Sequence, residues 1–345
     1  GNTNMKTLAI CTLFLALVFF TLPAQSVELK DGHPDIYTVI KGDTLWDISG
    51  VFLDKPWLWP EIWHVNPQVR NPHLIYPGDE LKLVYIDGKP RIVLSRDEKL
   101  SPQMRVLSEG DAIPTIPLDV IGPFLYSPRI LSEDELDSAP YILAADSQRL
   151  IYGQGSKVYM RGVIDQSRTG YSLFRKGDPY YDPETNELLG IEAIHLGSGK
   201  KIRNGDPATM MIHESVQEIM GGDRALPYED KLFPPVFMLR PPNHTVNAYL
   251  IAVYNGVTQI GVYDVVILNK GERDQIEVGH VLTVMQSGRL VEDEFSATEK
   301  DQLVTLPSEI AGQIMVFRTF EKTSLALVMR ANRPIHVMDT AVTPE

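Results

Sequence analysis

The sequence predicts an α+β protein with an N-terminal β-α-α-β module, a proline-rich linker and a mainly-β C-terminal region. Three observations lead to this fold class. Residues 37–84 combine a helix-capping pattern with short alternating strands at both ends. Seven prolines fall between Pro90 and Pro140. From Tyr141 onward the chain consists of short runs rich in β-branched and aromatic residues, bounded by Gly, Asn and Asp, which are typical of strands.

Residues 1–26 are typical of a secretory signal peptide. A lone positive charge precedes an apolar stretch, residues 8–22, whose 15 residues are fewer than the roughly 20 needed to span a bilayer. The small residues Ala24 and Ser26 suit positions −3 and −1, so we expect cleavage after Ser26. A retained N-terminal anchor is the alternative. Residues 1–4 precede the first Met as an expression scar or an upstream start and carry no structural weight.

Cysteine usage and charge exclude several classes of function. The single cysteine, Cys11, lies inside the apolar stretch rather than after it, so the chain from Val27 onward has none. The expected exported chain therefore has no lipid-modified cysteine, disulfide, thiol nucleophile or thiolate metal ligand. The net charge is −13 without a block of Lys or Arg, so we expect no nucleic-acid partner.

The first half of the N-terminal module contains a strand, a turn and a capped helix. Residues 37–39 alternate as a short strand would, and Gly42 and Asp43 then turn the chain. Thr44 is a good N-cap, and Asp47 three residues on completes a capping-box pattern. The apolar residues that follow share one helical face: Leu45, Ile48 and Phe52.

The second half predicts a helix and a closing strand. We expect the regular part of the helix to begin near Pro60, because a proline inside it would remove a hydrogen bond, and to run to about Asn66. An Asn-Pro break and a Pro-Gly turn come next. In the final strand Leu81 and Leu83 alternate with charged residues.

All four tryptophans of the chain fall within residues 46–63. A module this small buries little surface and depends on large apolar side chains for stability. Trp59 and Trp63 are four residues apart and share a side of the expected helix. We expect Trp59 and Ile62 to pack in the core. Trp57 has two readings: it faces a second domain or a partner, or it stacks on a sugar.

Residues 85–140 are expected to be a linker that wraps over the protein rather than swings. It contains one short helix in the sequence SEDELDSA, with Ser132 as the N-cap and Glu135 as its capping-box partner.

Two β-rich units are expected at 141–225 and 244–335, followed by a tail at 336–345. Residues 180–190 are typical of a hairpin with an Asp-Pro turn, whereas residues 221–243 have few strand signals and are expected to join the two units. The clearest strand signals are KVYMRGVI, ATMMIHESV, NAYLIAVY, IGVYDVVIL and HVLTVMQ.

Three spaced elements of the module together resemble a LysM domain: YTVIKGDTLWDIS, then Trp59, Ile62 and Asn66, then LIYPGDELKL. The chain departs from the family in a longer, Trp- and Pro-rich connection between the helices and in an extra loop. The resemblance implies binding of N-acetylglucosamine-containing glycan, in bacteria usually peptidoglycan, in a groove between two loops. The groove residues that it implies are Gly42, Asp43, Thr44 and Leu45 in one loop and Leu74, Ile75, Tyr76 and Pro77 in the other.

The chemistry of these loops suits that role, because a glycine lets a sugar approach the backbone and backbone groups can pair with N-acetyl groups. A purely structural role is the alternative, in which Thr44 caps the helix and Gly42 and Asp43 turn the chain; both roles are compatible.

Nearly the whole exported chain also resembles the LysM-containing proteins associated with type IV pilus secretins. The motifs that carry this resemblance are DKPWLWPEIWHVNPQVRNPHLIYPGDELKLVY, PFLYSPRIL, APYILAADSQRLIYGQGSKVYMRG and GVYDVVILNKGERDQIEVGHVLTV. It implies a periplasmic adaptor whose LysM domain holds peptidoglycan. It also implies that the C-terminal region, similar to a flagellar T-ring protein domain, associates with the secretin ring in the outer membrane.

We predict no catalytic residue, no metal site and no cofactor. None of the eight histidines falls in an H-x-H or H-E-x-x-H pattern, and no G-x-S-x-G is present. A glycosidase needs only two placed carboxylates, and among 45 Asp and Glu residues spacing does not exclude such a pair. A wall hydrolase with a LysM targeting module therefore stays as one alternative. A structural envelope protein without a pilus role is the other.

Overall fold

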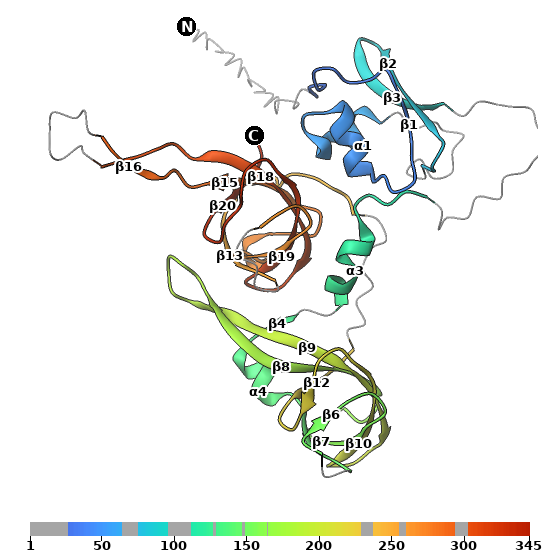
Figure 1. Cartoon of the computed structure of the whole chain (residues 1–345), viewed down its shortest axis with the longest axis vertical. Coiled ribbons are helices and arrows are strands. Elements are labelled where there is room, and N and C mark those ends of the chain that lie inside the picture. The colour runs from blue at the N-terminus through green and yellow to red at the C-terminus, as the bar shows by residue number, and fades with distance from the viewer. Residues whose placement is uncertain are drawn as a thin grey trace, which may run out of the picture.

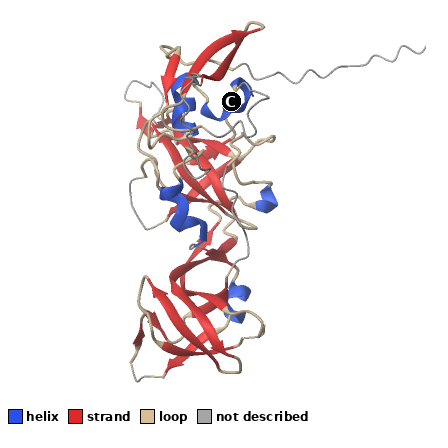
Figure 2. Cartoon of the chain, turned by 90° about the vertical axis from the view of Figure 1, so that its right-hand side faces the viewer, coloured by secondary structure: helices blue, strands red, loops and turns tan. Residues whose placement is uncertain are grey.

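The computed structural model describes residues 27–63, 75–95, 112–126, 129–146, 149–163, 165–228, 237–254, 260–293 and 303–345. The signal-peptide prediction, residues 1–26, lies outside these ranges. The described chain is elongated, with the N-terminal module at one end and two β-barrels below it (Figure 2). In the described ranges no helix is long and apolar enough to cross a membrane.

The N-terminal module is a three-stranded antiparallel sheet, in the order β1-β2-β3, with two helices and a 3-10 turn. Its elements are β1 (Ile36–Thr38), α1 (Leu45–Phe52), η1 (Pro56–Leu58), α2 (Trp59–Ile62), β2 (Glu80–Ile86) and β3 (Lys89–Ser95). The β-α-α-β order is as predicted, but β2 continues past residue 84. Asp87 and Gly88, with φ of 52° and 75°, form the two-residue turn to β3.

The helices of the module form where capping and apolar spacing place them. The Thr44 side chain accepts the Asp47 N–H at 3.1 Å, which confirms the predicted cap. α2 begins at Trp59, one residue before the expected Pro60, and ends at Ile62. It is shorter than predicted because Trp63 is extended and forms a parallel bridge to Ile92 of β3. The predicted burial of Trp59 and Ile62 is confirmed.

The span predicted as a linker, residues 85–140, consists in its described parts largely of regular elements. After β3 come α3 (Leu118–Tyr126), β4 (Arg129–Leu131) and α4 (Glu133–Ser138). The capping box between Ser132 and Glu135 is present as predicted. The described parts of this span therefore belong to the packed elements rather than to a separate linker.

The first barrel, β5 to β12, lies at the far end of the molecule from the module (Figure 1). Its sheet has the order β10-β7-β5-β12-β8-β9-β4, and β10 also pairs with β9, which closes the sheet on itself. Its strands are β5 (Tyr141–Ala145), β7 (Lys157–Arg161), β8 (Gly170–Tyr181), β9 (Leu188–Arg203), β10 (Ala208–Ser215) and β12 (Arg224–Pro227), with β6 (Ile151–Tyr152) and β11 (Ile219–Met220) as a separate pair. The hairpin predicted at 180–190 is the β8–β9 turn. The expectation that 221–243 only joins two units is wrong at β12.

The second barrel is closed, in the order β13-β14-β19-β18-β15-β20. Its elements are β13 (Asn247–Val253), β14 (Val265–Leu268), η3 (Glu272–Asp274), β15 (Val281–Gln286), β18 (Glu309–Thr319), β19 (Ser324–Ala331) and β20 (Thr340–Val342). A two-stranded arm of β16 (Leu290–Glu292) and β17 (Leu303–Thr305) projects from it (Figure 1). Residues 336–345 are not a tail, since β20 pairs with both β13 and β15 and closes the barrel.

Several strands of the second barrel are apolar on both faces. Successive side chains of a strand point to opposite faces, and here each face packs in a different hydrophobic cluster. In β18, Ile314 and Val316 belong to the cluster inside the barrel, whereas Met315 and Phe317 belong to the cluster that includes α3 and the N-terminal module. β14 and β19 divide in the same way. The outer face of these three strands is therefore covered, and the module shares a hydrophobic core with the barrel. This sharing supplies apolar contacts that a module of this size lacks on its own.

Candidate functional site

The two loops predicted to form the glycan groove lie side by side. The Val39 N–H donates to the Asp79 carbonyl at 2.9 Å, and the Gly78 N–H donates to the Val39 carbonyl at 2.7 Å. The loop before α1 and the loop before β2 are thus fixed to each other by backbone hydrogen bonds.

The first loop is held by the carboxylate of Asp43. That carboxylate accepts the Ile40 N–H at 2.9 Å and the Tyr37 hydroxyl at 3.0 Å. Burial, and then the hydrogen bond to Asp43, raise the pKa of Tyr37 to about 12, so the hydroxyl remains a donor at neutral pH. Gly42, at φ 101°, provides the left-handed position of the turn. Asp43 therefore serves the loop rather than pointing freely at a ligand.

The second loop repeats the same turn. The Asp79 carboxylate accepts the Tyr76 N–H at 3.0 Å, and the Asp79 N–H returns a bond to the Tyr76 carbonyl at 3.0 Å. Gly78 has φ of 93° and fills the position equivalent to Gly42. Two equivalent turns, Gly42-Asp43 and Gly78-Asp79, therefore lie on either side of the predicted site.

The predicted groove residues are close together but mostly covered. Gly42 is exposed, and Asp43 and Pro77 are half-buried. Four others are 0–7 % exposed: Thr44, Leu45, Ile75 and Tyr76. Leu74 lies outside the described residues. The role of Thr44 as a helix cap is confirmed, whereas its role in glycan binding stays a prediction.

This site is covered by a segment from the span that the sequence predicts to be a linker. The carbonyls of Pro114 and Thr115 accept the N–H groups of Leu45 and Trp46 at 3.0 and 3.1 Å. The Ile113 N–H donates to the Ile75 carbonyl at 2.8 Å. Residues 113–116, here called the groove segment, therefore run between the two loops. Pro114 and the adjoining Pro117 are typical of a linker, and they give no sign of this pairing in the sequence.

The site offers backbone donors on one side and an acceptor on the other. Leu45 and Trp46 open α1, so their N–H groups have no acceptor inside the helix. The Ile75 carbonyl faces them across the groove segment. Such a set of groups suits an amide, which carries one N–H and one carbonyl. Both a peptide backbone and an N-acetyl group have this chemistry.

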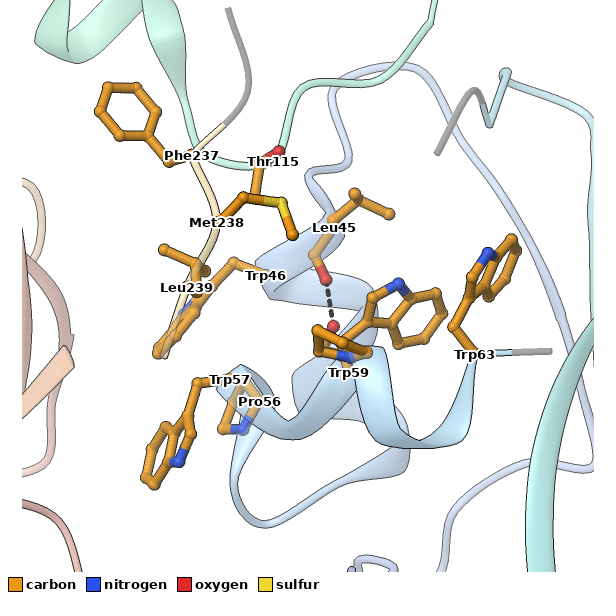
Figure 3. A pocket seen from close by; sticks show the side chains of 12 residues that line it. Leu45, Trp46, Pro56, Trp57, Trp59, Trp63, Thr115, Phe237, Met238 and Leu239 are labelled. Carbon is orange, nitrogen blue, oxygen red and sulfur yellow. Dashed lines mark hydrogen bonds between the residues drawn. The ribbon is translucent and has the colours of Figure 1, made fainter. Parts of the chain in front are cut away.

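A small apolar cavity borders the groove segment and is lined by all four tryptophans, by Thr115 and by residues 237–239 (Figure 3). Its volume is about 50 Å³, room for a water molecule or two but not for a sugar ring. Trp59 and Trp63 stack on one side with ring centroids 5.0 Å apart, and the Ser49 hydroxyl donates to the Leu45 carbonyl at 2.5 Å (Figure 3).

Trp57 points away from this stacked pair (Figure 3). It is 4 % exposed and belongs to the hydrophobic cluster shared with the second barrel. Of the two readings of Trp57, the domain-facing one agrees with this position, and sugar stacking does not. The Nε1 atoms of Trp57 and Trp63 and the Oγ1 atom of Thr115 have no hydrogen-bond partner among the described residues.

The sheet, the two short helices and the paired loops define a small β-α-α-β module. Residues 37–84 match the family model of the LysM domain, so this part of the chain is a LysM domain. LysM domains bind N-acetylglucosamine-containing glycans such as peptidoglycan and are not catalytic.

One curated protein shares part of this sequence. The chain is 43% identical over 60 residues to the uncharacterized protein YqbP of Bacillus subtilis (strain 168). The match spans 14% of this chain and 27% of that protein.

Proposed function

We propose that this protein is an exported, non-catalytic adaptor that binds peptidoglycan through its LysM domain and an envelope protein through its β region. The main support for peptidoglycan binding is the site between the two loops. There the N–H groups of Leu45 and Trp46 and the carbonyl of Ile75 form a donor and acceptor set for an amide. An N-acetyl group supplies the matching carbonyl and N–H. The family match at residues 37–84 supports the same ligand.

For the β region, we propose a secretin ring of the type IV pilus as the partner and the periplasm as the compartment. The support is the resemblance of the chain to the secretin-associated LysM proteins. The arm of β16 and β17 adds a physical argument, because Leu290 and Leu303 are 59% and 64% exposed on it. Apolar side chains gathered on a projecting element favour contact with another protein.

Co-sedimentation with purified sacculi tests the wall-binding half. We expect residues 27–345 to pellet with sacculi and to be released by soluble N-acetylglucosamine oligomers, since both would occupy the same site. Substituting the exposed Gly42 by Trp should reduce pelleting several-fold while the melting temperature falls little, because no atom lies within 4 Å of the added Cβ. The positive φ makes some strain unavoidable.

The matched control is Gly32→Trp, at another exposed glycine with φ of 76° and no atom within 4 Å of the added Cβ. It also places a side chain at a positive φ, but outside the two loops, and should pellet like the parent chain. Pelleting that resists the oligomers, or equal loss in both variants, would refute the assignment of the site.

Two simpler assays separate the remaining alternatives. A zymogram on sacculi distinguishes the adaptor from a wall hydrolase, since only the hydrolase clears the gel. Pull-down of purified secretin by residues 27–345 distinguishes the adaptor from a structural envelope protein without a pilus role.

A further inference from the structure

The LysM site of this chain is already filled by the chain itself. The groove segment, residues 113–116, accepts hydrogen bonds from the N–H groups of Leu45 and Trp46. It donates one from its own N–H to the Ile75 carbonyl. We propose that this segment is a built-in competitor of the glycan: it occupies the site in the resting protein and must leave before an N-acetyl group can enter. This inference rests on the proposed glycan binding.

The competition follows from chemistry, because the segment and the glycan present the same functional group. A peptide unit and an N-acetyl group are both secondary amides with one donor and one acceptor. The N–H groups of Leu45 and Trp46 each have one good direction for an acceptor, and Pro114 and Thr115 now provide it at 3.0 and 3.1 Å. A sugar N-acetyl carbonyl cannot use these donors until the segment carbonyls leave them.

Buried side chains also hold the groove segment on the site, in what is here called the closed state. Ile113 is 7 % exposed and Ile116 is 0 % exposed, and both belong to the hydrophobic cluster that contains Leu45 and Trp46. The closed state therefore combines three backbone hydrogen bonds with two anchored isoleucines. Main-chain pairing with side chains seated in pockets is how extended peptides bind to proteins in general.

The groove segment leads directly into α3, whose far end is fixed to the second barrel. The buried Arg318 guanidinium donates to the Leu125 carbonyl at 2.9 Å. The Phe124 ring packs edge-on against Tyr254, with centroids 5.3 Å apart. A partner or a load that shifts α3 on the barrel would pull on the segment, so the fold connects the β region to the glycan site.

The expected size of the effect follows from the tether. A segment on the same chain competes at a high effective concentration, and the apparent affinity of the glycan falls by the fraction of molecules that are open. If about one molecule in 10 to 100 is open, opening the site should tighten glycan binding about 10- to 100-fold.

The test compares two variants of residues 27–345. Ile113→Pro removes the N–H that donates to Ile75, since proline has none. Thr115→Ala is the matched control, because the Thr115 side-chain oxygen has no partner among the described residues and its carbonyl bond to Trp46 is retained. Amide hydrogen exchange at Leu45 and Trp46 reports whether the segment has left. Calorimetric titration with the N-acetylglucosamine tetramer reports the affinity.

We expect faster exchange at both amides in Ile113→Pro, with tetramer binding at least 10-fold tighter than in the parent chain or in Thr115→Ala. Unchanged exchange at Leu45 and Trp46 would show that the segment does not cover the site in solution and would overturn the proposal. Faster exchange with unchanged affinity would overturn it as well, while leaving glycan binding intact. If no variant binds the tetramer or pellets with sacculi, the proposed function fails and the competitor role fails with it.

A second measurement needs no substitution and guards against a variant that folds poorly. In the parent chain, saturating tetramer should speed exchange at Ile113, whose acceptor is lost, while Leu45 and Trp46 stay protected by the sugar. Ile113 exchange that tetramer binding leaves unchanged would contradict displacement.

Discussion

At the scale of single residues, the tryptophans divide into two tasks. Trp59 packs within the LysM domain, where it is 7 % exposed and stacks on Trp63. Trp57 is 4 % exposed in the cluster that joins the domain to the second barrel. A cluster of aromatic residues that resembles a sugar platform in the sequence is therefore core.

Trp59→Ala should unfold the LysM domain or destabilise it by about 3–5 kcal/mol, the usual cost of removing a buried tryptophan from a core. Trp57→Ala is the informative comparison, because it should loosen the domain from the second barrel and leave α1 and the three-stranded sheet folded. Hydrogen exchange of the β1–β3 amides distinguishes the two results. Protection of these amides that survives Trp59→Ala would mean that the ring contributes little to the core.

Residue-level prediction worked best where one interaction is local. The Thr44 cap and the Ser132–Glu135 capping box depend on atoms three residues apart, so the sequence shows both partners. The pairing of the Leu45 and Trp46 N–H groups with Pro114 and Thr115 could not be predicted in this way. The partners are far apart in sequence, and Pro114 and Pro117 are typical of a linker.

At the scale of elements, the β8–β9 hairpin is the piece that holds the two barrels together. Arg273 donates twice to the Glu187 carboxylate, at 2.8 and 2.9 Å, and Lys322 lies 2.7 Å from it. A buried hydrogen bond of 2.8 Å joins Asn269 to Asp182. The hydrogen bonds from Arg273, and then those from Lys322, lower the pKa of Glu187 to about 2.

This shift predicts an acid-sensitive contact between the barrels. Because the folded-state pKa is below the unfolded value of about 4.3, the contribution of Glu187 is complete above that pH and is lost as pH falls toward about 2. Glu187→Gln should lower the melting temperature slightly at pH 7, since the side chain is 39% exposed and solvent screens the pair. The same variant should show a smaller loss between pH 5 and pH 2.

Melting curves of the parent chain and of two variants check this expectation. Glu292→Gln, which removes a carboxylate from an exposed residue of β16, is the control for charge alone and should melt like the parent chain at pH 7. Parallel pH profiles for the parent chain and Glu187→Gln would show that the ion pair does not couple the barrels.

Strands were missed in the sequence where their partners are far away along the chain or where proline suggested a linker. β3 follows an Asp-Gly turn, a strong hairpin signal, yet Pro90 at its start made the span resemble a linker. β20 has only three residues and gains its place from β13 and β15, which are far away in sequence. The runs of β-branched and apolar residues in β13, β14 and β15 were visible from the sequence, but the closure of the barrel was not.

At the scale of the whole molecule, the LysM domain that contains the proposed glycan site packs directly on the β region. The LysM domain packs against the second barrel, α3 runs beside that barrel below the LysM domain, and the first barrel is attached through the β8–β9 hairpin (Figures 1 and 2). The exposed arm of β16 and β17 projects from the second barrel. The adaptor role that we propose would need both ends fixed in this way.

The decisive experiment is titration of isotope-labelled residues 27–345 with the N-acetylglucosamine tetramer, followed at each backbone amide by NMR. We expect saturable changes at Gly42, Leu45, Trp46 and Ile113, with the amides of the first barrel unmoved. Changes that map to the first barrel alone, or a chain that pellets with sacculi while these four amides stay still, would contradict glycan binding at the LysM loops.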